Sequence, residues 1–425
     1  MSDRIECVKS ALGNGLRVLT APMPAARSVT VMIMAGTGSR YEDRRINGIS
    51  HFMEHMFFKG AKRYPDAMAV ASAIDSVGGV FNAFTGEEKV AYFVKLSAAR
   101  KQTAYDVLSD MLLNSKFEQA EIDRERGVIV EEIRMYQDDP MSKVQMDFKS
   151  HFFGDQPLGW DIAGPEEVIR SVTRDDFITY RDLHYPADNC VVIAAGGVTH
   201  EENLELAERH FTFTARRPKE SAAPYRPQDG VRSRLTRREI EQSHFVLGFP
   251  IPGETHPDQP ALKVLVNILG GTMSSRLFYQ IRERRGLAYY IRASRQAYTD
   301  TGALAVSAGI NVEKLGEALA RVMDEIRKMA AEGVTDEELN RGKENIKGKI
   351  DLSTEDSMSL ANLFAGYETL YGKIKTPEEI VNEIDAVTMD AVNDVARRYL
   401  NPARARLAAL GPYESVEPFD RALDG

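Results

Sequence analysis

The chain has 425 residues, of which 43% are hydrophobic, so it is long enough for two to four domains with substantial cores. Its formal net charge of −9 argues against a nucleic-acid partner. No apolar run approaches the ~18 residues that a transmembrane helix needs, so we expect no membrane partner. The N-terminus has no secretory or organelle signal, and two isolated cysteines, Cys7 and Cys190, fit a reducing compartment. We therefore expect a cytoplasmic protein.

Residues 15–21 and 28–35 are predicted strands, and a polar loop at 36–47 leads into a predicted helix at 48–60. Asn47 or Ser50 can cap the start of this helix, and Gly60 can end it. Spacings of three and four place one set of its residues on a common face: His51, Glu54, His55 and Phe58. A second, apolar face can pack inward.

Two histidines four residues apart on a helix can bind one metal ion, and a Glu between them can reach water at that ion. The order here is His-x-x-Glu-His, from His51 to His55. The alternative is an ordinary helix with two buried histidines and a surface Glu54. The metal interpretation is favoured, but it requires a third ligand from elsewhere in the chain.

Residues 66–77 are a predicted helix, and residues 80–95 are predicted to form two strands separated by a turn at 85–87. If the first strand lies at a sheet edge, it can accept an extended peptide by backbone pairing. An ordinary interior strand pair is at least as good an interpretation. The residues concerned are Asn82, Ala83, Phe84 and Thr85.

A long predicted helix at 117–137 carries the candidate third ligand. Glu125 and Glu132 share a face with Ile122 and Ile129, whereas Glu131 lies about 100° away on a charged face. A carboxylate beside apolar residues must be paired or bind a metal, so Glu132 is a better candidate ligand than Glu131.

Two stretches of the second half repeat patterns of the first: 387–411 resembles 172–196, and 336–346 resembles 119–129. Residues 212–234 are rich in proline and charge and are a predicted linker. We therefore predict an α+β fold of two homologous domains, 1–211 and 235–425, each with a mainly antiparallel sheet flanked by helices. The second domain has no His-x-x-Glu-His, so only the first is expected to hold metal.

A Gly-Gly stretch at 269–290 lacks the Gly-Lys-Ser/Thr ending of a phosphate-binding loop, so nucleotide binding is not expected. Without further context, Arg282 is predicted at the surface and Tyr289 in the core.

These motifs resemble those of the M16 peptidase family, the inverzincins. The family motif matches His51, Glu54 and His55, and the ligand Glu that follows after a long gap matches Glu132. The family's second acid, seven positions before that Glu, matches Glu125. Its Arg and Tyr pair, seven apart in the second domain, matches Arg282 and Tyr289, and its substrate strand resembles residues 82–85.

The resemblance implies a zinc endopeptidase with one Zn²⁺ per chain, bound by His51, His55 and Glu132, with Glu54 as the general base. Glu125 would orient a ligand. Arg282 and Tyr289 would hold the substrate and the developing oxyanion. In the family this pair comes from another domain of a clam-shell chamber. The resemblance therefore implies a homodimer in which one subunit completes the other's site, and a chamber that admits short unfolded peptides.

Three alternatives remain at this point. The first is a non-catalytic assembly subunit, although such subunits usually lose motif residues. The second is a processing-type subunit that requires a different partner chain, although the zinc and Arg/Tyr motifs are both present here. The third is a peptide-binding module without chemistry, which the position of Glu54 disfavours.

Overall fold

The computed structural model describes residues 5–213, 221–228 and 230–424. These residues form two compact units. The first unit is drawn from Met1–Ile133, Trp160–Ala223 and Ile350–Ile380. The second unit is drawn from Arg134–Gly159, Pro224–Lys349 and Val381–Gly425.

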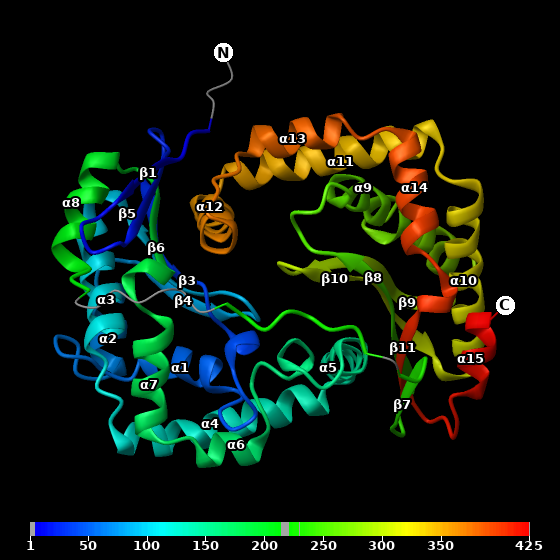
Figure 1. Ribbon diagram of the computed structural model, residues 1–425, viewed down its shortest axis with the longest axis horizontal. Coiled ribbons are helices and arrows are strands. Elements are labelled where there is room, and N and C mark those ends of the chain that lie inside the picture. Colours follow the sequence, from blue (N-terminus) through cyan, green and yellow to red (C-terminus); the bar gives the residue numbers. More distant parts are fainter. Residues whose placement is uncertain (1–4, 214–220, 229, 425) are drawn as a thin grey trace. The chain divides into compact units, whose positions relative to one another are not determined.

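The first unit is built on a six-stranded sheet with the order β1-β2-β6-β3-β5-β4 (Figure 1). Its strands are β1 (Val8–Ala11), β2 (Arg17–Pro22), β3 (Ser28–Ala35), β4 (Val80–Thr85), β5 (Val90–Ser97) and β6 (Cys190–Gly196). β2 and β6 run parallel, and the other neighbours run antiparallel. β4 pairs only with β5 and therefore forms one edge of the sheet.

The second unit repeats this plan without the first strand, in the order β7-β11-β8-β10-β9. Its strands are β7 (Ser233–Arg237), β8 (Gln242–Pro252), β9 (Ala288–Ala297), β10 (Thr301–Asn311) and β11 (Arg406–Gly411). β7 and β11 are parallel, as β2 and β6 are, and the other pairs are antiparallel. The matching orders and directions confirm the predicted α+β fold with two similar, mainly antiparallel sheets.

Helices cover both faces of the first sheet because its central strands have apolar side chains on both faces. Val31 and Ile33 of β3 pack in the larger core, whereas Met32 and Met34 pack against the opposite helix. The helices of this unit are α1 (Ile49–Phe57), α2 (Ala67–Asp75), α3 (Lys101–Asn114), most of α4 (Gln119–Asp138), α6 (Glu166–Ser171), α7 (Arg174–His184), α8 (His200–His210) and α12 (Ser357–Tyr371).

The second sheet is covered in the same way, with separate apolar clusters on its two faces. The helices that lie wholly in this unit are α5 (Pro140–Phe153), α9 (Gln259–Gly270), α10 (Leu315–Glu332), α14 (Met389–Tyr399) and α15 (Glu417–Asp424). α11 (Asp336–Thr354) and α13 (Pro377–Asp385), like α4, have residues in both units.

Each sheet is covered on one face by a helix from the other half of the chain. α12 lies against β3 and β6 of the first unit (Figure 1). Leu360 and Phe364 of α12 share one apolar cluster with Met32 and Ile193 of these strands. α5 lies against β8 and β11 of the second unit. The compact units therefore combine segments from both sides of the predicted linker.

The predicted linker at 212–234 lies partly outside the described residues, because 214–220 and 229 are not described. Within the described part, Pro224–Gln228 belongs to the second unit and β7 begins at Ser233, inside the predicted linker. The strand Val8–Ala11 was not predicted from the sequence. Among the described residues, no helix combines the length and apolar character that crossing a bilayer requires.

Candidate metal centre

The predicted polar face of α1 is partly exposed, and its predicted apolar face is buried. His51, Glu54 and His55 are partly exposed, while Phe52 and Met56 are buried. The burial pattern thus confirms the two faces that the spacing predicts.

The predicted caps of α1 are wrong, because the helix begins after Gly48 and ends at Phe57. Gly48 has a φ of 101° and its side-chain position is blocked, since a Cβ there would lie 2.5 Å from the carbonyl oxygen of Ala163. Only glycine fits such a position. Asn47 and Ser50 provide no side-chain cap.

Glu42 satisfies the N-terminus of α1 instead, a role that no spacing in the sequence predicted. Its Oε1 accepts the N–H of Ser50 at 2.8 Å, and its Oε2 accepts the N–H of Gly48 at 2.8 Å. The Asn47 side chain donates to the same oxygen at 2.9 Å. Burial raises the pKa of this carboxyl, and these hydrogen bonds oppose the shift. Glu42 therefore fixes the start of the helix that carries both histidines.

Glu132 of α4 lies beside both histidines, whereas Glu131 is exposed. Glu132 Oε1 lies 3.7 Å from Nε2 of His51, and Oε2 lies 3.5 Å from Nε2 of His55. One donor atom from each of the three side chains lies within 4.8 Å of the others. The choice of Glu132 over its neighbour thus agrees with the geometry of the first unit.

This donor set fits a zinc ion. Both imidazole–carboxylate distances exceed hydrogen-bonding range, so the three groups are gathered together without bonding one another. Donors about 2.0–2.1 Å from a tetrahedral zinc ion lie roughly 3.3–3.5 Å apart. Burial, and then the nearby His55, lower the pKa of His51 to about 4, which favours the neutral form that binds metal. Nδ1 of His51 is buried and has no hydrogen-bond partner among the described residues.

Glu125 holds the second histidine. Its Oε1 lies 2.9 Å from Nδ1 of His55, which leaves Nε2 of that ring facing Glu132. Its Oε2 lies 2.6 Å from Nζ of Lys59, a contact that was not predicted from the sequence. Burial alone would raise the pKa of Glu125, but the hydrogen bonds with His55 and Lys59 outweigh burial and lower it.

Glu54 lies on the same helix face and is held by the edge strand. The hydroxyl of Thr85, at the end of β4, donates to Oε2 of Glu54 at 2.5 Å. Burial raises the pKa of Glu54, and this hydrogen bond opposes the shift. The contact connects the predicted base to the predicted substrate strand.

The strand that contains Asn82, Ala83, Phe84 and Thr85 is an edge strand, so the interior-pair alternative is wrong. It pairs with β5 from Val80 to Thr85 and has no second neighbouring strand among the described residues. An edge of this kind can accept an extended peptide as a further strand.

Arg282 and Tyr289 belong to the second unit, whereas the histidines belong to the first. Arg282 lies in a π-helical turn, Phe278–Glu283, and its guanidinium is 4.8 Å from the ring centroid of Phe278. It is exposed, as predicted. Tyr289 lies on the edge strand β9 and is 59% exposed, so its predicted core position is wrong.

Two family models match the chain. Residues 17–166 match the family described as insulinase (peptidase family M16), and residues 171–346 match the peptidase M16 inactive domain. An uncharacterized zinc protease of Mycobacterium leprae is 36% identical, over 98% of this chain and 94% of that protein. One of Bacillus subtilis is 36% identical, over 94% of this chain and 97% of its own.

A protease of Helicobacter pylori of known crystal structure has the same fold. Its TM-score is 0.90 at 24% identity, over 96% of this chain and 100% of that chain. The similarity to the curated zinc proteases extends over nearly the whole length of both sequences. The chain therefore belongs to the M16 peptidase family.

Proposed function

We propose that this protein is a zinc metalloendopeptidase of the His-x-x-Glu-His type that cleaves short, unfolded peptides. The observation that carries the proposal is the convergence of His51, His55 and Glu132, with Glu54 on the same helix face. The names of the relatives support zinc as the metal. We expect one zinc ion per chain.

When bound, zinc would supply Lewis-acid activation of water and of the scissile carbonyl. Glu54 takes a proton from the attacking water and delivers it to the leaving amine. A C–O bond forms as the peptide C–N bond breaks, so the reaction needs no other reactant. Thr85 holds the Glu54 carboxylate, and Glu125 holds the His55 ring.

The edge strand β4 supports an extended peptide as the substrate. A peptide that pairs with residues 82–85 would lie beside Thr85 and hence beside Glu54. The paired segment must have free backbone N–H and C=O groups, which an unfolded chain offers along its whole length and a folded protein offers only at its sheet edges. That requirement favours short or unfolded substrates over folded proteins.

We also propose that Arg282 and Tyr289 of one subunit complete the site of another in a homodimer. The exposure of both side chains is compatible with contact to substrate. Mixing a Glu54→Gln protein with a Tyr289→Phe protein is expected to restore part of the peptidase activity. Mixtures that stay as inactive as the two separate variants would contradict the shared site.

A non-catalytic or processing-type subunit is the competing function. Peptide cleavage by the purified protein alone, lost with a chelator and restored by zinc, distinguishes the two. A zinc-loaded homogeneous protein that cleaves no peptide from a diverse quenched-fluorescence library would favour the non-catalytic alternative.

A further inference from the structure

Lys59, just beyond the end of α1, forms an ion pair with the carboxylate that orients a candidate ligand. Its Nζ lies 2.6 Å from Oε2 of Glu125, and Oε1 of Glu125 lies 2.9 Å from Nδ1 of His55. One carboxylate thus connects the ammonium to the imidazole. The Glu125 side chain is 4% exposed and that of Lys59 is 26% exposed.

A buried carboxylate needs a compensating positive charge or a full set of hydrogen bonds. Within the described part of the chain, Lys59 is the one Lys or Arg that forms an ion pair with Glu125. Without that ammonium, the Oε2 side of Glu125 loses its strong partner. The carboxylate is then free to rotate or to move toward water, and it no longer fixes the His55 ring.

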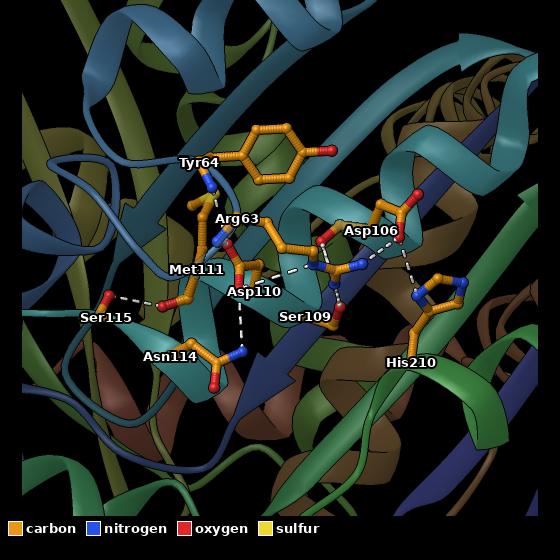
Figure 2. Close-up of polar contacts among 9 residues, drawn as sticks. All are labelled: Arg63, Tyr64, Asp106, Ser109, Asp110, Met111, Asn114, Ser115 and His210. Atoms are coloured by element: carbon orange, nitrogen blue, oxygen red, sulfur yellow. Dashed lines mark hydrogen bonds and ion pairs between the residues drawn. The ribbon is translucent and has the colours of Figure 1, made fainter.

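The loop that follows Lys59 is itself held in place from α3 (Figure 2). The fully buried Asp110 accepts the N–H of Arg63 at 2.7 Å and that of Tyr64 at 3.1 Å through one carboxylate oxygen. The Arg63 guanidinium bonds Asp106 at 2.5 Å, and Asp106 lies 3.2 Å from His210. These contacts anchor the loop at Arg63 and Tyr64. The N–H of Lys59 itself donates to the carbonyl of Met56 at 3.1 Å, so its side chain approaches Glu125 from a backbone held on both sides.

We propose that Lys59 is a positioning residue of the metal centre, acting on His55 through Glu125. The inference rests on the proposed zinc site but not on peptide cleavage. Groups that orient a metal ligand typically contribute 10–100-fold to metal affinity. Lys59→Met is therefore expected to weaken zinc binding by about 10–100-fold, and Lys59→Arg, which keeps the cation, by much less.

The test is zinc affinity, measured on the full-length protein by competition with a chromophoric chelator. Lys62→Met is the matched control, since Lys62 is an exposed lysine of the same loop without an ion pair in the described structure. It is expected to bind zinc like the wild type. Melting curves recorded with excess chelator show whether each metal-free variant is folded. If Lys59→Met is not folded, Lys59→Gln replaces it in the affinity measurement.

Glu125→Gln and the double variant show whether Lys59 acts through Glu125. If it does, Lys59→Met in the Glu125→Gln background changes affinity by no more than about twofold, because the coupled contact is already lost. Wild-type affinity in folded Lys59→Met, or an equal loss in both backgrounds, would overturn the inference. A wild type that binds zinc but cleaves no peptide would instead overturn the proposed function and leave this inference standing.

Discussion

At the residue scale, the helix that carries His51 and His55 depends on a carboxylate that precedes it in the chain. Glu42 is buried and accepts two backbone N–H groups and one side-chain N–H at the start of α1. A Gln at this position presents an NH₂ group to at least one of these donors. The result is a buried, unsatisfied backbone donor next to His51.

Glu42→Gln is expected to lower the free energy of unfolding by about 2–3 kcal/mol, the scale of losing hydrogen bonds to a charged group. Urea unfolding of the metal-free protein measures this change. Asp75→Asn is a suitable control, because Asp75 is exposed at the end of α2. Equal stability of Glu42→Gln and the wild type would show that Glu42 does not hold the helix.

Two adjacent glutamates on α4 offer a second comparison at this scale. Glu132 faces both histidines, and Glu131 is exposed. Glu132→Gln is expected to weaken zinc binding by more than the ~10–100-fold typical of losing a group that merely orients a ligand. Glu131→Gln is expected to bind zinc normally. Equilibrium dialysis measures the zinc affinity of both variants. Normal zinc binding by Glu132→Gln and weak binding by Glu131→Gln would show that Glu131, and not Glu132, is the ligand.

At the element scale, the sequence predicted most of what positions the centre. The His-x-x-Glu-His spacing predicted the partly exposed polar face of α1. The spacing of the apolar residues in α4 predicted that Glu132, and not Glu131, lies beside the histidines. Both follow from local helical periodicity. Glu42 and Lys59 were missed because their roles depend on contacts made after folding, which no spacing encodes. Tyr289 was misplaced because an aromatic residue at the start of an edge strand can remain exposed.

The contact between β4 and α1 also gives a prediction at this scale. Thr85→Val removes the hydroxyl that holds Glu54, so the carboxylate loses its orientation but the three proposed metal ligands stay intact. We expect kcat to fall by about tenfold, roughly 1.4 kcal/mol of barrier, with unchanged zinc content. Thr85→Ser should retain most of the activity because it keeps the hydroxyl. A Val variant as active as the Ser variant would argue against this role.

At the scale of the whole molecule, the duplicated sheets were predictable but the exchange of helices was not. Repeated patterns at 172–196 and 387–411 indicated two similar units, and the strand orders agree. The predicted boundaries assumed that each half folds on its own residues. α5 and α12 instead cover the sheet of the other half, because each sheet has a second apolar face that needs a helix.

Removing the second half of the chain therefore has a specific consequence for the first. A fragment of residues 1–223 lacks α12, so it exposes the sheet face that includes Met32, Met34 and Ile193. We expect this fragment to aggregate or to bind a hydrophobic dye strongly. Addition of a segment spanning residues 350–380 is expected to reduce dye binding without abolishing it, because α5 has also lost the sheet that it covers. A soluble fragment 1–223 that unfolds cooperatively and binds no dye would show that the first sheet does not need α12 to cover it.

The most direct test of the central claim is to measure zinc content and peptide cleavage on the same preparations of wild type and Glu54→Gln. We predict about one zinc ion per chain in both, with chelator-sensitive cleavage by the wild type. Glu54→Gln is predicted to lose at least about 100-fold in kcat, because it lacks the group that transfers the proton. Undiminished cleavage by zinc-loaded Glu54→Gln, or cleavage by a wild type free of zinc, would contradict the account.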